Sequence, residues 1–121
     1  MASTRQRGAY WEQVAEAYLK RQGLKTLERN YQARFGEIDL VMLDGRTLVF
    51  AEVRYRKSNR HGSGADSVTA VKQRRIINTA RRFLQQHPHE SGRPCRFDVL
   101  SIGSGICGPR IDWIRNAFDT G

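Results

Sequence analysis

The stretch GEIDLVMLDGRTLVFAEVR, residues 36–54, contains two apolar runs separated by Asp44-Gly45. An Asp-Gly pair between alternating apolar runs is a strong signal for a two-residue β-hairpin turn. The sequence therefore predicts two strands, near residues 37–43 and 47–55, joined by a tight turn with Asp44 and Gly45 as its loop.

This hairpin would gather charged side chains on one face. In the predicted register Glu37 faces Glu52, and because side chains alternate along a strand, Glu37, Asp39, Glu52 and Arg54 share a face. Asp39 and Glu52 then become diagonal neighbours, with Cα atoms about 7–8 Å apart. Two carboxylates at that spacing can share one hard cation. We expect a divalent-metal site with Asp39 and Glu52 as ligands, joined by the backbone carbonyl of Val53.

The remaining elements surround the hairpin. An apolar stripe with helical spacing predicts a first helix over residues 6–22, capped by Ser3 or Thr4 and ended by Gly23. We expect an extended segment over 24–33, an exposed loop over 57–66, a second helix over 68–86 capped by Asp66 or Ser67, loops over 93–96 and 103–109, a strand over 97–102 and a last strand over 111–114. This order predicts an α/β fold, a mixed central β-sheet flanked by helices, in a single domain covering residues 1–121.

Four polar residues of the two helices need separate consideration. Glu12 lies at the border of the first apolar stripe and would point along the seam between helix and sheet, whereas Glu16 should face water. Gln73 projects onto the stripe of the second helix, and Lys72 flanks it. Glu12 and Lys72 also fit ordinary surface charges, and Gln73 also fits a core amide bonded to the backbone.

The composition points to a polyanionic partner. Twenty-one Lys and Arg against 12 Asp and Glu give a formal net charge of +9 in 121 residues. Such an excess suits nucleic acid first and an anionic membrane surface second, although a solvated basic surface has the same composition. The candidate contacts to a nucleic-acid backbone are Arg34, Arg56, Arg60, Arg74 and Arg75.

Other classes of function fit the sequence less well. No apolar run reaches membrane-spanning length, and the first residues lack the apolar core of a secretory signal, so we expect a cytoplasmic protein that does not enter the membrane. In that compartment Cys95 and Cys107 are most simply interpreted as reduced thiols. With His87 and His89 nearby a zinc site is conceivable, but the spacing matches no familiar pattern.

The acidic pair suits phosphodiester hydrolysis. That reaction needs an activated water, neutralised charge on the phosphate and a stabilised leaving oxygen, and one or two Mg²⁺ ions supply most of this. Arg54 lies two residues beyond Glu52 on the same face, close enough to touch the attacked phosphate. Glu12 would add a ligand or orient a water from the helix.

Several motifs resemble a known family. The element order and the Asp39–Glu52 spacing resemble the PD-(D/E)XK nuclease superfamily, with its αβββαβ restriction-endonuclease-like core. A closer likeness, over about residues 8–118, is to the YraN family of bacterial proteins, which is described as similar to archaeal Holliday-junction resolvases. The motifs that carry it are residues 29–31 (RNY), 36–40 (GEIDL), 50–56 (FAEVRYR), 71–75 (VKQRR) and 96–99 (RFDV).

The resemblance implies roles for individual residues. Asp39 and Glu52 would bind Mg²⁺ or Mn²⁺, Glu12 would be the helix carboxylate of resolvase-like members, and Lys72 and Gln73 would reach the site from the second helix. It further implies an endonuclease that acts on structured or branched DNA as a homodimer.

Two positions depart from the superfamily pattern. Ile38 replaces a proline that is often absent, and Arg54 replaces the superfamily lysine. An arginine stays charged, so Arg54 can clamp a phosphate oxygen but is a poor general base. Either the metal-activated water needs no such base, or Lys72 substitutes, or the site no longer cuts. In the last case the protein would be a binding module for nucleic acid, DNA or RNA, including a ribosome-associated one.

Overall fold

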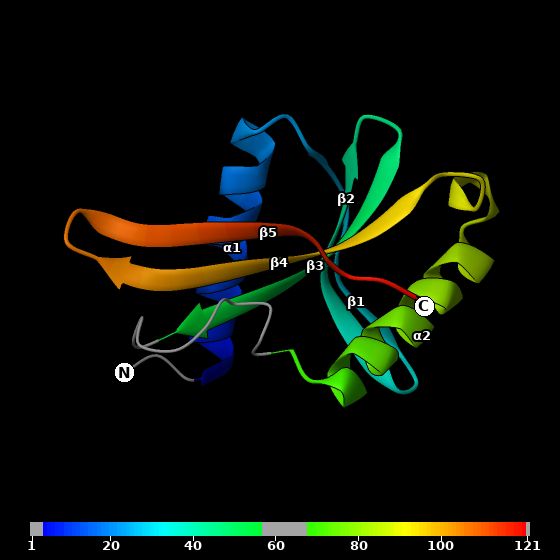
Figure 1. The fold of residues 1–121 in the computed structure, drawn as a ribbon, viewed down its shortest axis with the longest axis horizontal. Coiled ribbons are helices and arrows are strands. Elements are labelled where there is room, and N and C mark those ends of the chain that lie inside the picture. Colours follow the sequence, from blue (N-terminus) through cyan, green and yellow to red (C-terminus); the bar gives the residue numbers. More distant parts are fainter. Residues whose placement is uncertain (1–3, 57–67, 121) are drawn as a thin grey trace.

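The structure, a computed structural model, describes residues 4–56 and 68–120. Five strands lie side by side in the order β1-β2-β3-β4-β5 (Figure 1). Neighbours are antiparallel except β3 and β4, which are parallel. The predicted mixed sheet flanked by helices is therefore confirmed. The elements in chain order are α1 (Thr4–Arg21), β1 (Lys25–Ala33), β2 (Gly36–Asp44), β3 (Thr47–Arg56), α2 (Ala70–Gln86), the short 3-10 helix η2 (Pro88–Glu90), β4 (Cys95–Gly105) and β5 (Gly108–Phe118).

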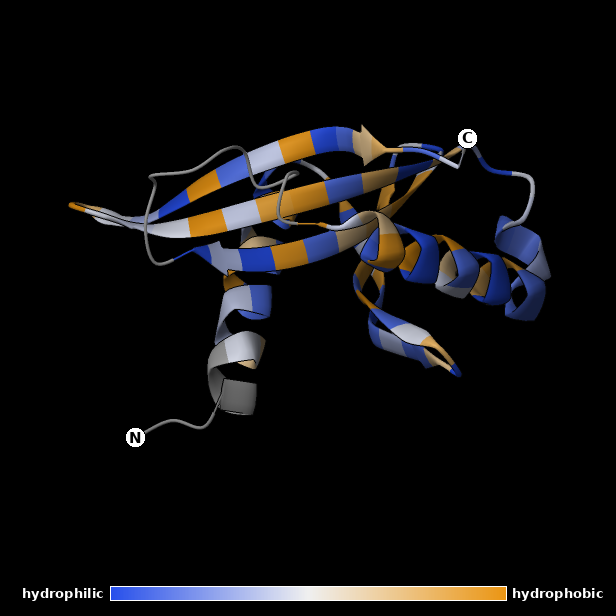
Figure 2. Cartoon of the chain, turned by 60° about the horizontal axis from the view of Figure 1, so that its bottom comes forward, coloured by the Kyte–Doolittle hydropathy of each residue, from blue (hydrophilic) through white to orange (hydrophobic). Residues whose placement is uncertain are grey.

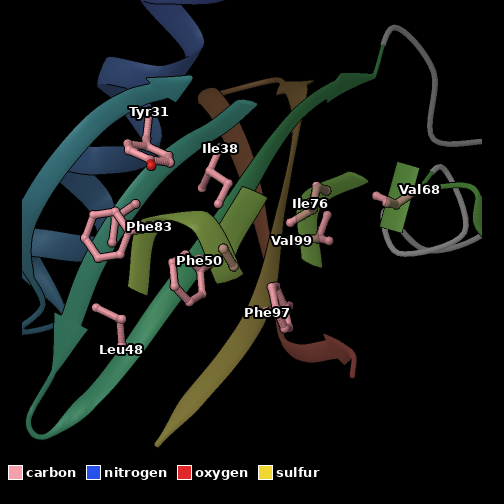
Figure 3. Close-up of a cluster of buried hydrophobic side chains, with 11 residues drawn as sticks. Tyr31, Ile38, Leu48, Phe50, Val68, Ile76, Phe83, Phe97 and Val99 are labelled. Carbon is pink, nitrogen blue, oxygen red and sulfur yellow. The ribbon is translucent and has the colours of Figure 1, made fainter. Parts of the chain in front are cut away.

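The two helices cover opposite faces of the sheet, so the molecule has two hydrophobic cores. Under α2, Phe83 packs edge to face on Tyr31 and Phe50, as Figure 3 shows. Under α1, Ala15 and Leu19 pack on alternate residues of β2, β3 and β4. The parallel pair needs a crossover, and α2 lies within it between β3 and β4. Each face of the sheet is therefore buried by one predicted amphipathic helix.

The helix ends follow local chemistry. Gly23 has a φ of +97°, the left-handed conformation predicted for the end of α1. The cap of α2 differs from the prediction. Thr69 is the N-cap residue, and its hydroxyl accepts a hydrogen bond from the Lys72 N–H at 3.2 Å. A threonine directly before the first helical residue satisfies an otherwise unpaired N–H as well as the expected aspartate or serine would. The predicted cap at Ser3 and the loop over 57–66 lie outside the described residues.

The predicted hairpin register was wrong by two residues. Asp44 pairs with Thr47 and Val41 with Phe50, so the loop is Gly45-Arg46. Gly45 has a φ of +60°, which suits the first loop position of a type II′ turn, whereas an Asp-Gly loop would have required a positive φ at Asp44 as well. A shift of two preserves which face each side chain occupies.

The last two strands are longer than the sequence suggested. Residues 95–96 and 103–105 belong to β4, and β5 begins at Gly108, so only two residues form the turn that was expected to be a loop over 103–109. The ladder continues through residues without apolar alternation because backbone hydrogen bonds between antiparallel strands need no particular side chain. In Figure 1 this hairpin extends well beyond the rest of the sheet.

Candidate functional site

The site lies where β2 and β3 separate. Their paired residues end at Leu40 and Ala51, and the next residue of β2 is Asp39. Its carboxylate takes the place of the missing ladder bond, since the Val53 N–H donates to Asp39 Oδ2 at 2.8 Å. Ile38 packs into the core under α2, whereas Leu40 packs into the core under α1. Asp39 therefore lies at the junction between the two faces of the sheet.

Three carboxyl groups from three elements meet there. Glu52 of β3 is only 6% exposed, and burial, followed by the charge of Asp39 and a hydrogen bond to it, raises the pKa of Glu52 to about 8. Burial and the same neighbour raise the pKa of Glu12 of α1 to about 7, with a further contribution from Glu37. Asp39 is thus within hydrogen-bonding reach of both glutamates. Close carboxylates repel, so the group holds protons at neutral pH.

Two cations adjoin the carboxyl groups. Lys72 of α2 places its Nζ 3.4 Å from Glu52 Oε1. Arg54 is half-buried on the same strand as Glu52, and both cations lower the Glu52 pKa in part, Lys72 more than Arg54. Burial and Asp39 outweigh these two cations, because the pKa of Glu52 remains raised.

Asn30 is a further site residue, and the sequence pattern predicts no role for it. Its φ of +51° places it in the left-handed region, which asparagine tolerates better than most residues. With its amide nitrogen turned toward α1, it donates to Glu12 Oε1 at 2.6 Å. The signal was present, since asparagine followed by an aromatic residue forms part of the RNY motif, but the sequence could not show the positive φ.

The strand residue before Asn30 is held by α1. Arg29 Nη2 lies 2.7 Å from Glu16 Oε2, and the Thr26 hydroxyl donates to the same oxygen at 2.6 Å. Glu16 is 7% exposed, so the expectation that it faces water was wrong. The hydrogen bond from Arg29 is the largest cause that lowers the Glu16 pKa. These contacts offset the free-energy cost of burying the Glu16 carboxylate, and they hold α1 against β1.

The three carboxyl groups, the two cations and Asn30 line one pocket of about 670 Å³. Trp11 and Tyr55 form a wall of it, stacked with ring centroids 4.4 Å apart. The four side chains predicted to share a face all line it. The full lining is Gly8, Ala9, Trp11, Glu12, Asn30, Gln32, Glu37, Asp39, Glu52, Val53, Arg54, Tyr55 and Lys72.

The oxygen atoms in the pocket suit a hard cation that takes its remaining ligands from water or substrate. Within residues 4–56 and 68–120 no three His, Cys, Asp or Glu side chains form a complete metal-binding group. Mg²⁺ is usually held by one or two carboxylates and keeps several waters or substrate oxygens. Asp39, Glu52 and Val53, the predicted ligands, all line the pocket.

Comparison with known proteins assigns the family. The model of the uncharacterised protein family UPF0102 matches residues 11–102. The chain belongs to the UPF0102 family. It is 52% identical over 119 residues to a UPF0102 protein of Nitrosomonas europaea, covering 98% of each chain. A UPF0102 protein of Pseudomonas aeruginosa is 50% identical over 119 residues, covering 97% of this chain and 95% of the relative.

Other predicted site residues of this UPF0102 chain lie away from the pocket. Gln73 donates through Nε2 to the Val68 carbonyl at 2.9 Å, which is the core-amide alternative. Arg56 is mostly buried, with Nη2 3.9 Å from Asp112 Oδ2. Arg34, Arg74 and Arg75 are exposed. Arg60 lies outside the described residues.

Two remaining expectations concern the cysteines and membranes. Cys95 and Cys107 are both free and exposed. Neither helix in the described part of this UPF0102 chain combines the length and the apolar character that crossing a bilayer requires.

Proposed function

We propose that this UPF0102 chain is a metal-dependent endonuclease that hydrolyses phosphodiester bonds in structured or branched DNA. The observation that carries the proposal is the convergence of Glu12, Asp39 and Glu52 in one open pocket beside Lys72 and Arg54. A divalent cation would relieve the repulsion among these carboxyl groups and release the protons they hold. The resemblance to PD-(D/E)XK nucleases supports the same chemistry.

Each side chain has a distinct part in this proposal. Asp39 and Glu52, with the Val53 carbonyl, would hold Mg²⁺ or Mn²⁺, which would neutralise phosphate charge and activate water. Glu12, held by Asn30, orients the attacking water. Arg54 donates hydrogen bonds to the scissile phosphate through its planar, permanently charged guanidinium group. Lys72 Nζ, placed beside Glu52 from α2, substitutes for the lysine that Arg54 replaces.

The substrate and setting rest on the resemblance and on charge. A net charge of +9 suits a nucleic-acid backbone, and Arg34, Arg74 and Arg75 are exposed for such contacts. A branched junction has two strands to cut, so we propose that a homodimer acts on it. We place the activity in the cytoplasm, where DNA is accessible and exposed thiols such as Cys95 and Cys107 stay reduced.

Cleavage of a four-way DNA junction tests the proposal. We expect products with Mg²⁺ or Mn²⁺ and none with EDTA. Asp39→Asn should lower the rate by about a hundredfold or more. The asparagine oxygen can still accept from the Val53 N–H, so this variant should fold normally by circular dichroism.

Glu90→Gln is the matched control for this experiment. It removes one negative charge from η2, where Glu90 contacts Arg93 rather than the pocket, and should cut like the wild type. Junction that stays intact with every divalent metal would contradict the hydrolase proposal.

Arg54 favours one alternative function, a nucleic-acid-binding module that no longer cuts. Its binding partner would be DNA or RNA, including RNA on the ribosome. If the wild type binds junction DNA with Mg²⁺ without cutting it, and Arg54→Lys restores cleavage, the protein is a nucleic-acid-binding module and not an active nuclease. Competition between DNA and RNA of equal length then identifies the partner.

A further inference from the structure

The turn between β1 and β2 exposes an aromatic side chain. Phe35 is 71% exposed at a position where turns usually carry small or polar residues. The guanidinium carbon of Arg34 lies 5.1 Å from the centre of its ring, within cation–π range. In Figure 2 this turn projects from the sheet beside α2. An exposed Phe contributes little to folding, so its place at a projecting turn needs another explanation.

The turn is held firmly against α2. A Cβ atom on Gly36 would lie 2.8 Å from Thr79 Oγ1, so only glycine allows this approach. The Thr79 hydroxyl in turn donates to the Arg75 carbonyl at 2.7 Å. Behind the turn, Tyr31 is buried and packs edge to face on Phe83. Phe35 is therefore presented by a rigid support.

The surroundings of Phe35 are positively charged. The shallow pocket beside it is lined by Ala33, Arg34, Phe35, Asn78, Thr79 and Arg82, and this lining contains two arginines and no carboxylate. Arginine attracts phosphate, and an aromatic ring offers a face to any nucleobase. Two arginines without a carboxylate suit an anionic partner, and a nucleic acid offers both phosphates for the arginines and base faces for the ring, so we favour a nucleic-acid occupant.

We propose that Phe35 stacks on an unpaired base of the nucleic acid whose backbone enters the carboxylate pocket. Phe35 precedes Asp39 by four residues of extended chain, about 13 Å, which corresponds to about four base steps at 3.4 Å each. The inference rests on the nucleic-acid-binding part of the proposed function and narrows its substrate to structures with unpaired bases near the cut.

Equilibrium binding in EDTA tests this without any cleavage. The probes are a duplex with a gap of unpaired bases and a fully paired duplex of the same length, each with a fluorescent label for anisotropy. Phe35→Ala should weaken binding to the gapped probe by about ten- to a hundredfold and leave the paired duplex unchanged. Phe35→Trp should keep the gapped-probe affinity, whereas Phe35→Leu, which is apolar without a π face, should lose it.

Two further variants separate stacking from general effects. Ile106→Ala removes a fully exposed apolar side chain from the β4–β5 turn and should change neither affinity. Arg34→Gln should lower the salt dependence of binding, whereas Phe35→Ala should not, because stacking releases no counterions.

The possible outcomes distinguish this inference from the proposed function. Equal losses on both probes, full rescue by leucine, or a change of oligomeric state in Phe35→Ala would overturn stacking. Binding that depends on Phe35 without cleavage in metal would overturn only the hydrolase. A wild type that binds neither probe would overturn both.

Discussion

Glu52 is the residue on which the chemistry of the pocket depends most. It is buried in the sheet and faces Asp39, and Lys72 and Arg54 offset its charge in part. Evolution of a stable fold alone would favour an uncharged side chain there, since burying a carboxyl costs free energy in its ionised form. This cost is consistent with the proposed role of Glu52 as a metal ligand, because a bound cation would offset it.

The raised pKa values predict how stability depends on pH without metal. The folded state holds protons on Glu12 and Glu52 up to pH values near 7 and 8, whereas the unfolded chain releases them near 4.5. The folded state therefore binds more protons between these values, and the free energy of unfolding falls as pH rises from about 4.5 to about 8. Urea unfolding across this range should show a fall of roughly 4–6 kcal/mol, most of it from Glu52, because the contribution of Glu12 is reduced by its greater exposure to solvent.

Glu52→Gln checks the assignment. The amide cannot ionise, so the variant should lose most of the pH dependence and be more stable than the wild type at pH 9 in EDTA. Glu90→Gln, outside the pocket, should keep the wild-type profile. A wild type that gained stability over this pH range would contradict the assignment. Added Mg²⁺ should raise the melting temperature of the wild type more at pH 8 than at pH 6, since fewer protons must leave.

At the scale of elements, the contact between the β1–β2 turn and α2 makes a sharp prediction. Gly36→Ala places a methyl group against Thr79 Oγ1, whose hydroxyl is already committed to the Arg75 carbonyl. We expect a loss of about 1–3 kcal/mol in the free energy of unfolding, as is typical of overpacking.

A double-mutant cycle separates this clash from other effects. Thr79→Ala removes the obstructing hydroxyl, so Gly36→Ala should cost much less in that background. Equal costs in both backgrounds would show that backbone freedom, rather than the hydroxyl, requires glycine at this position.

The β2–β3 hairpin shows which structural features the sequence predicts and which it does not. Alternation along residues 36–54 predicted correctly that Glu37, Asp39, Glu52 and Arg54 point into one space, and this survived a wrong register because the error was two residues. The prediction of the turn was wrong because Gly45 is the first loop residue and not the second. Side-chain periodicity does not reveal which residue takes a positive φ.

Contacts between elements distant in the sequence were harder to predict. The helical pattern assigned Glu16 to the solvent face because it cannot show that Arg29 of β1 reaches over to it. The separation of β2 from β3 also leaves no mark in the sequence, and it is this separation that lets Asp39 meet Glu12 of α1 and Glu52 of β3 together. The acidic residues were therefore predictable, and their support by Asn30 was not.

For the molecule as a whole, charge predicts the salt dependence of binding. Each phosphate contact by a basic side chain adds about 0.9 to the slope of log affinity against log salt for duplex DNA. Arg74 is exposed on α2, close along the chain to Lys72 of the pocket. Arg74→Gln should reduce the magnitude of the slope by about one and weaken binding equally across sequences.

Arg46→Gln is the matched control, because it makes the same charge change at the β2–β3 turn. That turn lies at the other end of β2 from Gly36, about 30 Å away along the strand. The salt-dependence slope of Arg46→Gln should equal that of the wild type. Equal reductions in the two variants would mean that the basic surface acts through net charge alone.

The position of the pocket ties its integrity to both halves of the fold. Glu12 is held by the helix on one side of the sheet and Lys72 by the helix on the other, while Asp39 occupies the split between two strands. Loosening of either hydrophobic layer moves one of these groups away from the rest. A nuclease of the kind proposed above would therefore be inactive in a partly folded chain with only one intact hydrophobic layer, because its site would be incomplete.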